Sequence, residues 1–268
     1  MKHLLADWSK LKQGLGGKII FLFLDYDGTL APIADRPNKA LIPGEVKKLL
    51  KSLTKIPNCN VSIISGRAVN DVKKRVGIKN IIYAGNHGLE IEGPKIKFKV
   101  NLTMKFRITL AAIKKELIRK LLKIKGVFME DKGLTLSLHY RLVDKRYIPR
   151  VKTIFYETIA THLAKDKIQV KSGKMVLELR PPVEWDKGKI VLWLLARRQF
   201  TNGKKKVLPI YVGDDVSDED AFRILKNKAI TVVVGQPKQS YAKYYLKSTR
   251  EVTELLKQIL DYCNTKEQ

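Results

Sequence analysis

The chain has 268 residues, and 53 Lys or Arg against 26 Asp or Glu give it a formal net charge of +27. With 44% hydrophobic residues it is too apolar to be disordered, and its length predicts one large or two smaller folded domains. The longest apolar runs, Ile19–Leu24 and Ile190–Ala196, are too short to cross a membrane, and residues 1–17 lack a secretory signal. Two cysteines make neither a disulfide framework nor a zinc site. We therefore expect a cytoplasmic protein with no membrane partner.

The positive charge would suit three classes of anionic partner, namely nucleic acid, anionic lipid and phosphorylated metabolites. The Lys and Arg residues are spread along the whole chain, without the block of like charges that is typical of a nucleic-acid-binding tail. Dispersed charge of this kind is more often a property of the surface than a binding device. The charge alone does not choose among these partners.

Buried strands alternate with helices at both ends of the chain. The run Ile19–Leu24 is continuously apolar and ends abruptly at Asp25, which predicts a strand covered on both faces. The alternation predicts an α/β fold, here a doubly wound, Rossmann-like parallel sheet. The further elements of this core are a helix over Pro43–Leu53, a strand over Asn60–Ile64, a helix over Val69–Val76, a strand over Asn80–Ala84, a helix over Gly188–Arg198, a strand over Val207–Val212, a helix over Asp218–Leu225, a strand over Ala229–Val234 and a helix over Glu251–Tyr262.

The middle of the chain has a different pattern. Met104–Lys125 predicts a long basic amphipathic helix, and Leu134–Tyr140 alternates in the way of a half-exposed antiparallel strand. We expect an α+β unit over residues 105–181, inserted into an α/β core made of residues 1–104 and 182–268. The long helix carries Ile108, Ala111, Ala112, Lys115 and Ile118 on helical spacing; the other elements are strands over Val127–Glu130, Ile168–Val170 and Val176–Arg180 and a helix over Ile148–Leu163.

Two groups of acidic residues follow buried strands. Asp25 and Asp27 come where the first strand ends, and by themselves they fit an Asx turn as well as a ligand site. The second group places five carboxylates within Asp214–Asp220. Carboxylates so close together repel each other unless a cation neutralises them, and oxygen ligands suit Mg²⁺. We assign Asp214 and Asp218 to the metal and leave Glu219 and Asp220 to the helix, which we expect to begin near Asp218.

Two further polar residues stand at the ends of predicted elements. Ser65 follows the second strand, and Lys187 stands at the start of a predicted helix. Lys189, two residues further on, is the other candidate for a functional lysine at this position. Each of these is ordinary alone. Their chain order, Asp-x-Asp, Ser, Lys and then Gly-Asp-Asp, resembles that of the haloacid-dehalogenase-like phosphatases, and the Asp-Lys-Gly context favours Lys187.

A narrower resemblance covers roughly residues 18–260. Several segments are similar to the trehalose-6-phosphate phosphatases. They are Asp25–Ile33, Ile64–Arg67, Gly85–Glu90, Glu130–Arg141 and Gly213–Phe222.

This resemblance implies a phosphatase that requires Mg²⁺ and hydrolyses trehalose 6-phosphate to trehalose and phosphate, the last step of trehalose biosynthesis. Asp25 would be the nucleophile that forms an aspartyl-phosphate, and Asp27 the general acid and base. Ser65 and Lys187 would hold the phosphoryl oxygens. The implied metal ligands are Asp25, the main-chain carbonyl of Asp27, Asp214 and, directly or through water, Asp218 or Asp215.

The resemblance also implies that the core is the catalytic domain and that residues 105–181 are a cap that contacts the sugar, whose hydroxyl groups suit charged donors and acceptors. For each charged cap residue the competing interpretation is a solvated strand face. The cap candidates are Glu130, Lys132, Arg141, Lys174 and Glu178, and the candidates on the core side are Arg67, His87 and Glu90.

Three alternatives stay open. The first is another sugar phosphatase, acting on sucrose phosphate or mannosyl-3-phosphoglycerate. The second is a nucleic-acid-binding protein built on a phosphatase core that has lost its activity. All four catalytic motifs are intact, which argues against this alternative. The third is association with a trehalose-6-phosphate synthase through the charged surface. We expect a monomer whose partner is a small sugar phosphate.

Overall fold

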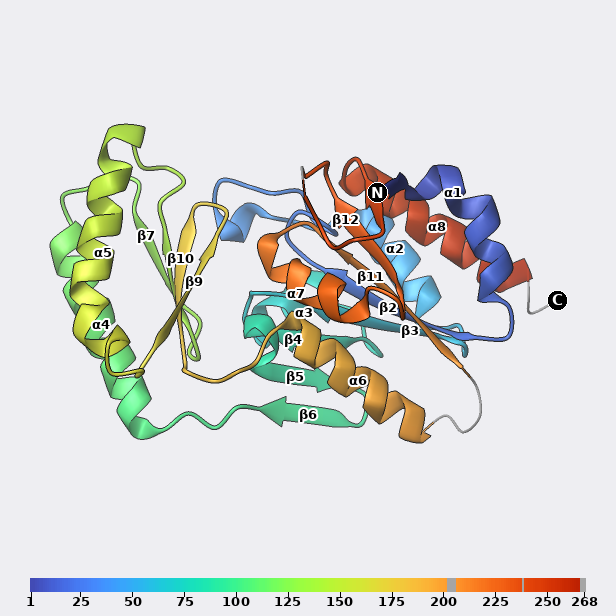
Figure 1. The fold of residues 1–268 in the computed structure, drawn as a ribbon, viewed down its shortest axis with the longest axis horizontal. Helices are drawn as coiled ribbons and strands as arrows, with labels where there is room; N and C mark the ends of the chain where they lie inside the picture. Colours follow the sequence, from blue (N-terminus) through green and yellow to red (C-terminus); the bar gives the residue numbers. More distant parts are fainter. Residues whose placement is uncertain (202–205, 238, 266–268) are drawn as a thin grey trace. The chain divides into compact units, whose positions relative to one another are not determined.

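The structure is a computed structural model that describes residues 1–201, 206–237 and 239–265. The chain divides into two compact units: unit 1 is Met1–Phe98 with Trp185–Gln268, and unit 2 is Lys99–Glu184. Figure 1 shows both units along the chain. The expected boundaries, after residue 104 and before residue 182, lie six and three residues from those of the units, and the division into core and cap stays a prediction.

Unit 1 contains a mixed sheet that confirms the predicted α/β class. In the described part of the chain its nine strands follow the order β1-β13-β12-β11-β2-β3-β4-β5-β6. All pairs from β1 to β4 are parallel, whereas β5 runs antiparallel to β4. The two outermost strands at each end of the sheet, β1 and β13 at one end and β5 and β6 at the other, were not predicted. The strands are β1 (Lys2–His3), β2 (Ile19–Asp25), β3 (Cys59–Ile64), β4 (Ile82–Gly85), β5 (Glu90–Gly93), β6 (Ile96–Lys99), β11 (Val207–Gly213), β12 (Ile230–Val234) and β13 (Tyr244–Leu246).

Helices cover both faces of this sheet, which explains the continuous apolar run of β2. Leu22 and Leu24 point into one buried cluster, while Phe21 and Phe23 point into another on the opposite face. Every residue of β2 is buried. The first cluster is closed by α1 (Leu4–Leu11), α2 (Gly44–Leu53), α3 (Val69–Val76) and α8 (Thr249–Thr265), and the second by α6 (Lys187–Thr201) and α7 (Val216–Leu225) (Figure 1).

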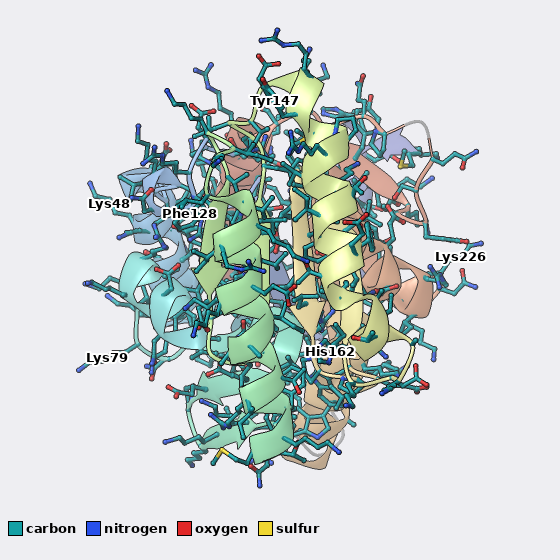
Figure 2. All side chains as sticks on the ribbon, turned by 90° about the vertical axis from the view of Figure 1, so that its left-hand side faces the viewer. Lys48, Lys79, Phe128, Tyr147, His162 and Lys226 are labelled. Atoms are coloured by element: carbon teal, nitrogen blue, oxygen red, sulfur yellow. The ribbon has the colours of Figure 1, made fainter. Side chains whose placement is uncertain are left out.

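Unit 2 is an α+β unit. Its sheet has the order β7-β8-β10-β9 with antiparallel pairing throughout. Figure 1 shows two helices on one face of this sheet, and in Figure 2 they lie side by side, with His162 on the second. The elements are α4 (Met104–Leu121), β7 (Phe128–Asp131), β8 (Leu136–His139), α5 (Ile148–Leu163), β9 (Gln169–Gly173) and β10 (Val176–Arg180).

The first helix of unit 2 buries a different face from the one singled out in the sequence. Ile108 and Ile118 are exposed, with 63% and 45% of their surface accessible. The buried stripe of α4 has helical spacing too, and its aromatic and leucine side chains remove more apolar surface from water than the alanines of the other stripe. This stripe is Phe106, Leu110, Ile113, Leu117 and Leu121.

Several lysines of unit 1 lie on its surface. Lys48, Lys79 and Lys226 are exposed, and Figure 2 shows their side chains directed outward. Among the described residues, no helix is both long enough and apolar enough to pass through a lipid bilayer.

Candidate active site

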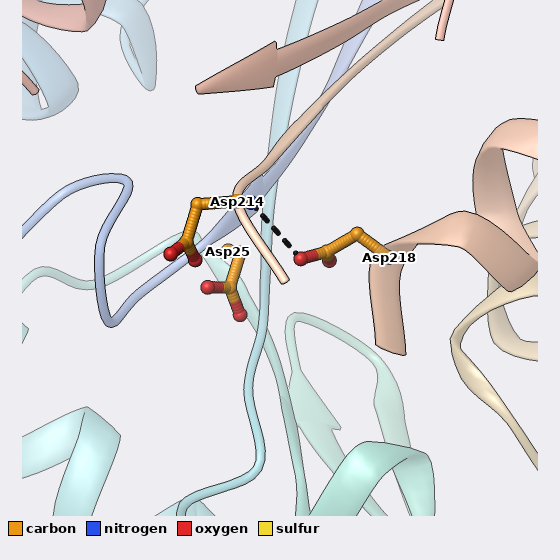
Figure 3. Close-up of side chains that lie close together, drawn as sticks. All are labelled: Asp25, Asp214 and Asp218. Atoms are coloured by element: carbon orange, nitrogen blue, oxygen red, sulfur yellow. Dashed lines mark hydrogen bonds between the residues drawn. The ribbon is translucent and has the colours of Figure 1, made fainter. Parts of the chain in front are cut away.

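Three aspartates meet where neighbouring strands of unit 1 end. Asp25 is the last residue of β2, and Asp214 directly follows β11, the strand paired with β2. Asp218 comes from the first turn of α7. One carboxylate oxygen of each aspartate lies within 4.8 Å of the other two, and Figure 3 shows the three side chains close together. The carboxyl ends of parallel strands are where open α/β sheets bind ligands.

Lys187 joins two of these aspartates. Its Nζ donates hydrogen bonds to Asp25 Oδ1 (2.7 Å) and Asp218 Oδ1 (2.8 Å), and only 2% of its side chain is exposed. Burial disfavours the charge of Lys187, but the two carboxylates more than compensate and raise its pKa. Lys189 uses its main-chain N–H to bond Asp186 in the first turn of α6. The structure therefore places Lys187, the residue favoured by its sequence context, among the carboxylates.

Asp25 is an unusual carboxyl group. Burial raises its pKa well above the ordinary value of 3.8, and the charges of Asp218 and Asp214 raise it further, while Lys187 lowers it. One lysine offsets only part of the charge of three carboxylates. The site therefore favours an additional cation.

Asp218 is fully buried, and four donors occupy its two oxygens. Oδ1 accepts from Lys187 and from the Tyr211 hydroxyl at 2.7 Å, and Oδ2 accepts from the main-chain N–H groups of Asp214 (3.1 Å) and Asp215 (3.0 Å). A carboxylate has about four lone-pair sites. Because the protein fills all of them, Asp218 is better suited to position Lys187 and the main chain of Asp214 than to bind a metal directly.

The helix that carries Asp218 begins earlier than predicted. α7 starts at Val216 because Asp215 is its N-cap and forms a capping box with Asp218. The carboxylate of Asp215 accepts from Val216 N at 2.7 Å. Glu219 lies in the first turn of α7, the helix to which the sequence assigned it, and its carboxylate also accepts from Ser240 Oγ (2.7 Å) and Tyr241 N (2.8 Å) in the loop after β12.

The donor set fits a magnesium ion. Mg²⁺ takes oxygen ligands and binds through one or two carboxylates with water and phosphate in its other positions. Asp25 and Asp214 supply the carboxylates that would hold the ion directly. Gly28 keeps the approach open, since a Cβ there would lie 2.1 Å from Asp214 Oδ2, and its φ of +81° also favours glycine. The predicted contribution of the Asp27 carbonyl stays a prediction.

Asp27 is held by Arg67 through two parallel hydrogen bonds. Arg67 Nε and Nη2 donate to the two carboxylate oxygens of Asp27, each at 2.7 Å. The same guanidinium donates to Asp71 (2.8 Å) and to the carbonyl of Pro37 (2.7 Å). Only 6% of the Arg67 side chain is exposed, against 41% for Asp27. Arg67, predicted as a substrate contact, therefore also fixes the predicted acid and base.

The ends of β3 and β4 position the remaining core candidates. Ser65 is buried, and its Oγ accepts from Arg67 N at 3.1 Å. His87 donates its main-chain N–H to the carbonyl of Ser65 at 2.9 Å. A Cβ on Gly66 would lie 2.6 Å from His87 Nε2, so this glycine lets the imidazole pack against the backbone. Glu90 accepts a hydrogen bond from the amide of Asn86.

The five residues of unit 2 that were predicted to contact the sugar take part in three separate interactions. Lys132 Nζ donates to Glu178 Oε1 at 2.8 Å, and this oxygen also accepts from Thr135 and Ser137. Glu130 pairs with His139 Nε2 at 2.9 Å. Arg141 donates to the carbonyl of Lys174 at 2.7 Å. The interpretation as a solvated strand face is wrong for Glu178, which is 4% exposed.

Two residues of the site were missed by the sequence analysis. Tyr211 lies inside β11 and bonds Asp218, and a buried tyrosine hydroxyl usually needs such a partner. Asp71 supports Arg67 from one helical turn further on. The sequence contained a signal for each of them: a tyrosine within an apolar strand for Tyr211, and an Arg–Asp pair at i, i+4 for Asp71.

Replacing Arg67 with Lys is expected to lower kcat about 10- to 100-fold, because an ammonium lacks the planar fork that makes two parallel hydrogen bonds to Asp27. Steady-state phosphate release measures this change. Arg75 is the matched control: it bonds Asp71 but not Asp27 in the structure, so Arg75→Lys should keep most activity. Equal losses in the two variants would contradict a special role for the Arg67–Asp27 pair.

Known proteins match this chain over nearly its full length. A model of the trehalose-phosphatase family covers residues 23–250. The chain belongs to the trehalose-phosphatase family. This trehalose-phosphatase is therefore a phosphoric monoester hydrolase, as the sequence predicted. It is 34% identical to probable trehalose-phosphate phosphatase D of Arabidopsis thaliana, over 96% of this chain and 72% of the relative.

Two further relatives agree with this assignment. Trehalose-phosphate phosphatase B of Arabidopsis thaliana is 32% identical over 92% of this trehalose-phosphatase and 67% of its own length. The solved C-terminal domain of a trehalose-6-phosphate phosphatase from C. albicans superposes with a TM-score of 0.83. It is 26% identical and covers 97% of this chain and 98% of its own. The predicted haloacid-dehalogenase-like fold is confirmed by this likeness.

Proposed function

We propose that this trehalose-phosphatase hydrolyses trehalose 6-phosphate to trehalose and phosphate through an aspartyl-phosphate on Asp25. The observation that carries the proposal is the buried Asp25–Lys187–Asp218 chain of hydrogen bonds beside Asp214, at the carboxyl edge of the sheet. The family assignment supports the substrate. A role in the last step of trehalose biosynthesis follows from that substrate.

In the first half-reaction, a carboxylate oxygen of Asp25 attacks phosphorus. The bond between phosphorus and the sugar oxygen breaks, and Asp27 donates a proton to the departing oxygen. Lys187 fixes the position of Asp25 through its hydrogen bond, and with Ser65 it would contact the phosphoryl oxygens. For this step Asp27 must release at least one of its two hydrogen bonds to Arg67.

In the second half-reaction, water attacks the phosphorus of the aspartyl-phosphate. Asp27, now a carboxylate, accepts the proton of that water, and the bond from phosphorus to Asp25 breaks to release phosphate. Both residues return to their starting states. Asp27 therefore acts as acid and then as base without any further titratable group.

Asp25 and Asp214 would hold Mg²⁺ with the Asp27 carbonyl as a further ligand, and Asp218 would support the site by positioning Lys187 and the main chain of Asp214. When bound, the ion neutralises the repulsion between the anionic phosphate and the anionic nucleophile. Asp215 is the weaker candidate because its carboxylate caps α7.

Removing the metal is expected to abolish phosphate release and to lower thermal stability. At about 100 times its Kd, Mg²⁺ should add about 2.7 kcal/mol to the free energy of unfolding, which differential scanning fluorimetry detects as a rise in Tm. Asp214→Asn should lose this rise, whereas Asp261→Asn, on the exposed side of α8, should keep it. An unchanged Mg²⁺ response in Asp214→Asn would contradict the assigned site.

We propose that unit 2 is the cap domain that contacts the sugar and determines which sugar phosphate is bound. Glu130, Lys132, Arg141, Lys174 and Glu178 are its candidate contacts, and Arg67, His87 and Glu90 are those of unit 1. The buried Lys132–Glu178 pair supports this assignment, because a buried ion pair fixed by two hydroxyl groups presents a defined donor and acceptor pattern.

Phosphate release from a panel of sugar phosphates tests the substrate. With Mg²⁺, trehalose 6-phosphate is expected to exceed sucrose 6-phosphate and mannosyl-3-phosphoglycerate in kcat/KM by at least about 100-fold. Glu178→Gln should raise KM for trehalose 6-phosphate. If either competitor had the higher kcat/KM, that sugar phosphate would be the substrate, and the proposed phosphatase mechanism would still hold.

Gel filtration with and without a trehalose-6-phosphate synthase tests the expected monomer and the proposed association.

A further inference from the structure

Unit 1 contains a cavity of about 450 Å³ that the proposed chemistry does not use. Phe21 lines it from β2, Asn60 from the start of β3 and Ile82 from the start of β4. These residues stand at the amino end of the parallel strands. Asp25 lies four residues beyond Phe21, or about 13 Å further along β2. The cavity is therefore separate from the candidate active site.

Apolar side chains form most of the cavity wall. Phe21, Ile82, Ile96 and Leu194 belong to or pack against the buried cluster on the α6 side of the sheet. Ligand sites for small molecules usually enclose about 300–1,000 Å³ and combine an apolar wall with a few polar groups. Both the volume and the lining of this cavity fall within that class.

The polar groups of the lining are cationic or amide, and none is acidic. Lys95 lies in the turn between β5 and β6, while Arg197 and Arg198 lie near the end of α6. The turn and the helix are held together, since Arg197 Nη2 donates to the carbonyl of Lys95 at 2.9 Å. Among the described residues, the buried Nδ2 of Asn60 has no hydrogen-bond partner.

We propose that this cavity is a second ligand site, which binds a small amphipathic carboxylate. The apolar wall takes the hydrocarbon body of the ligand. Lys95 and Arg197 attract the carboxylate at the rim, and Asn60 supplies a hydrogen-bond donor. The proposal does not depend on the substrate of the active site, because the residues of the two sites are different.

Octanoate and octanol are the test probes, since they share a hydrocarbon chain and differ in the carboxylate. Isothermal titration calorimetry of the whole protein should show one octanoate per chain, with an affinity at least about tenfold above that for octanol. In the double variant Lys95→Asn/Arg197→Gln, octanoate affinity should fall about tenfold while octanol affinity is kept. Asn suits position 95 because the backbone there has φ of 57°. The variant Ile82→Trp, which fills the cavity, should lose both ligands.

A matched double variant, Lys48→Asn/Lys257→Gln, removes two exposed charges from α2 and α8 and should bind octanoate like the original protein. Equal affinities for octanoate and octanol would overturn the proposal, as would the absence of octanoate binding. Unchanged binding in Lys95→Asn/Arg197→Gln would also overturn it. Because those two positions lie in a turn and near a helix end, this result stays decisive even where Ile82→Trp does not fold.

Discussion

Replacing Asp25 with Asn is expected to lower the rate of phosphate release by at least about 10⁴-fold. An amide is a poor nucleophile, and it also removes one of the two carboxylates that would hold Mg²⁺ directly. The fold should survive, because burial raises the pKa of Asp25 and thus makes the charged form costly. Circular dichroism and urea unfolding should show equal or greater stability for the variant without metal.

Two measurements separate loss of the nucleophile from loss of the metal. Acid quenching with radiolabelled substrate should trap phosphate on the original protein and not on Asp25→Asn. Calorimetry then gives the Mg²⁺ affinity of each. Asp261→Asn, with the same chemical change on the exposed side of α8, should keep full activity. Substantial turnover by clean Asp25→Asn protein would exclude the aspartyl-phosphate mechanism.

Replacing Lys187 with Met is expected to reduce both activity and stability. The lysine neutralises two buried carboxylates at 2.7 and 2.8 Å. Removing one partner of a buried ion pair typically costs about 3–5 kcal/mol, since the remaining charges lose their counterion. The loss of a positioned cation should also lower kcat by about 10²- to 10³-fold. Urea unfolding and steady-state assays measure the two effects.

Lys189→Met is the control, because it removes the same charge two residues further along α6. It should keep most of the activity and stability of the original protein. Saturating Mg²⁺ should recover part of the stability lost in Lys187→Met, as the ion replaces some of the missing positive charge. If Lys189→Met were the more damaging change, the role assigned to Lys187 would be wrong.

The core of the fold was predictable because its strands carry a strong local signal. β2 is buried on both faces and therefore reads as a continuous apolar run. The short β1 and β13 and the β5–β6 hairpin lack such a signal, since their pairing depends on neighbours distant in sequence. α4 has two stripes at helical spacing, and packing against the rest of unit 2 decides which one is buried.

The candidate site was predictable in its members but not in its internal contacts. Chain order and spacing identified Asp25, Lys187 and Asp214. Asp25 and Asp214 converge because β2 and β11 are neighbours, and Lys187 reaches them from the start of α6. Spacing does not reveal hydrogen-bond saturation, so the indirect role of Asp218 required the structure. The fork from Arg67 to Asp27 joins residues 40 positions apart, and no local pattern predicts it.

The hydrogen bond from Lys187 to Asp25 joins residues 162 positions apart, and all of unit 2 lies between them. The entropic cost of closing such a loop grows only with the logarithm of its length, so even doubling the whole loop would cost about 0.6 kcal/mol. The free energy of unfolding of unit 1 should therefore depend only weakly on the length of the inserted unit 2. Over evolution, the inserted unit can be lengthened or exchanged while the ion pairs of the core stay unchanged.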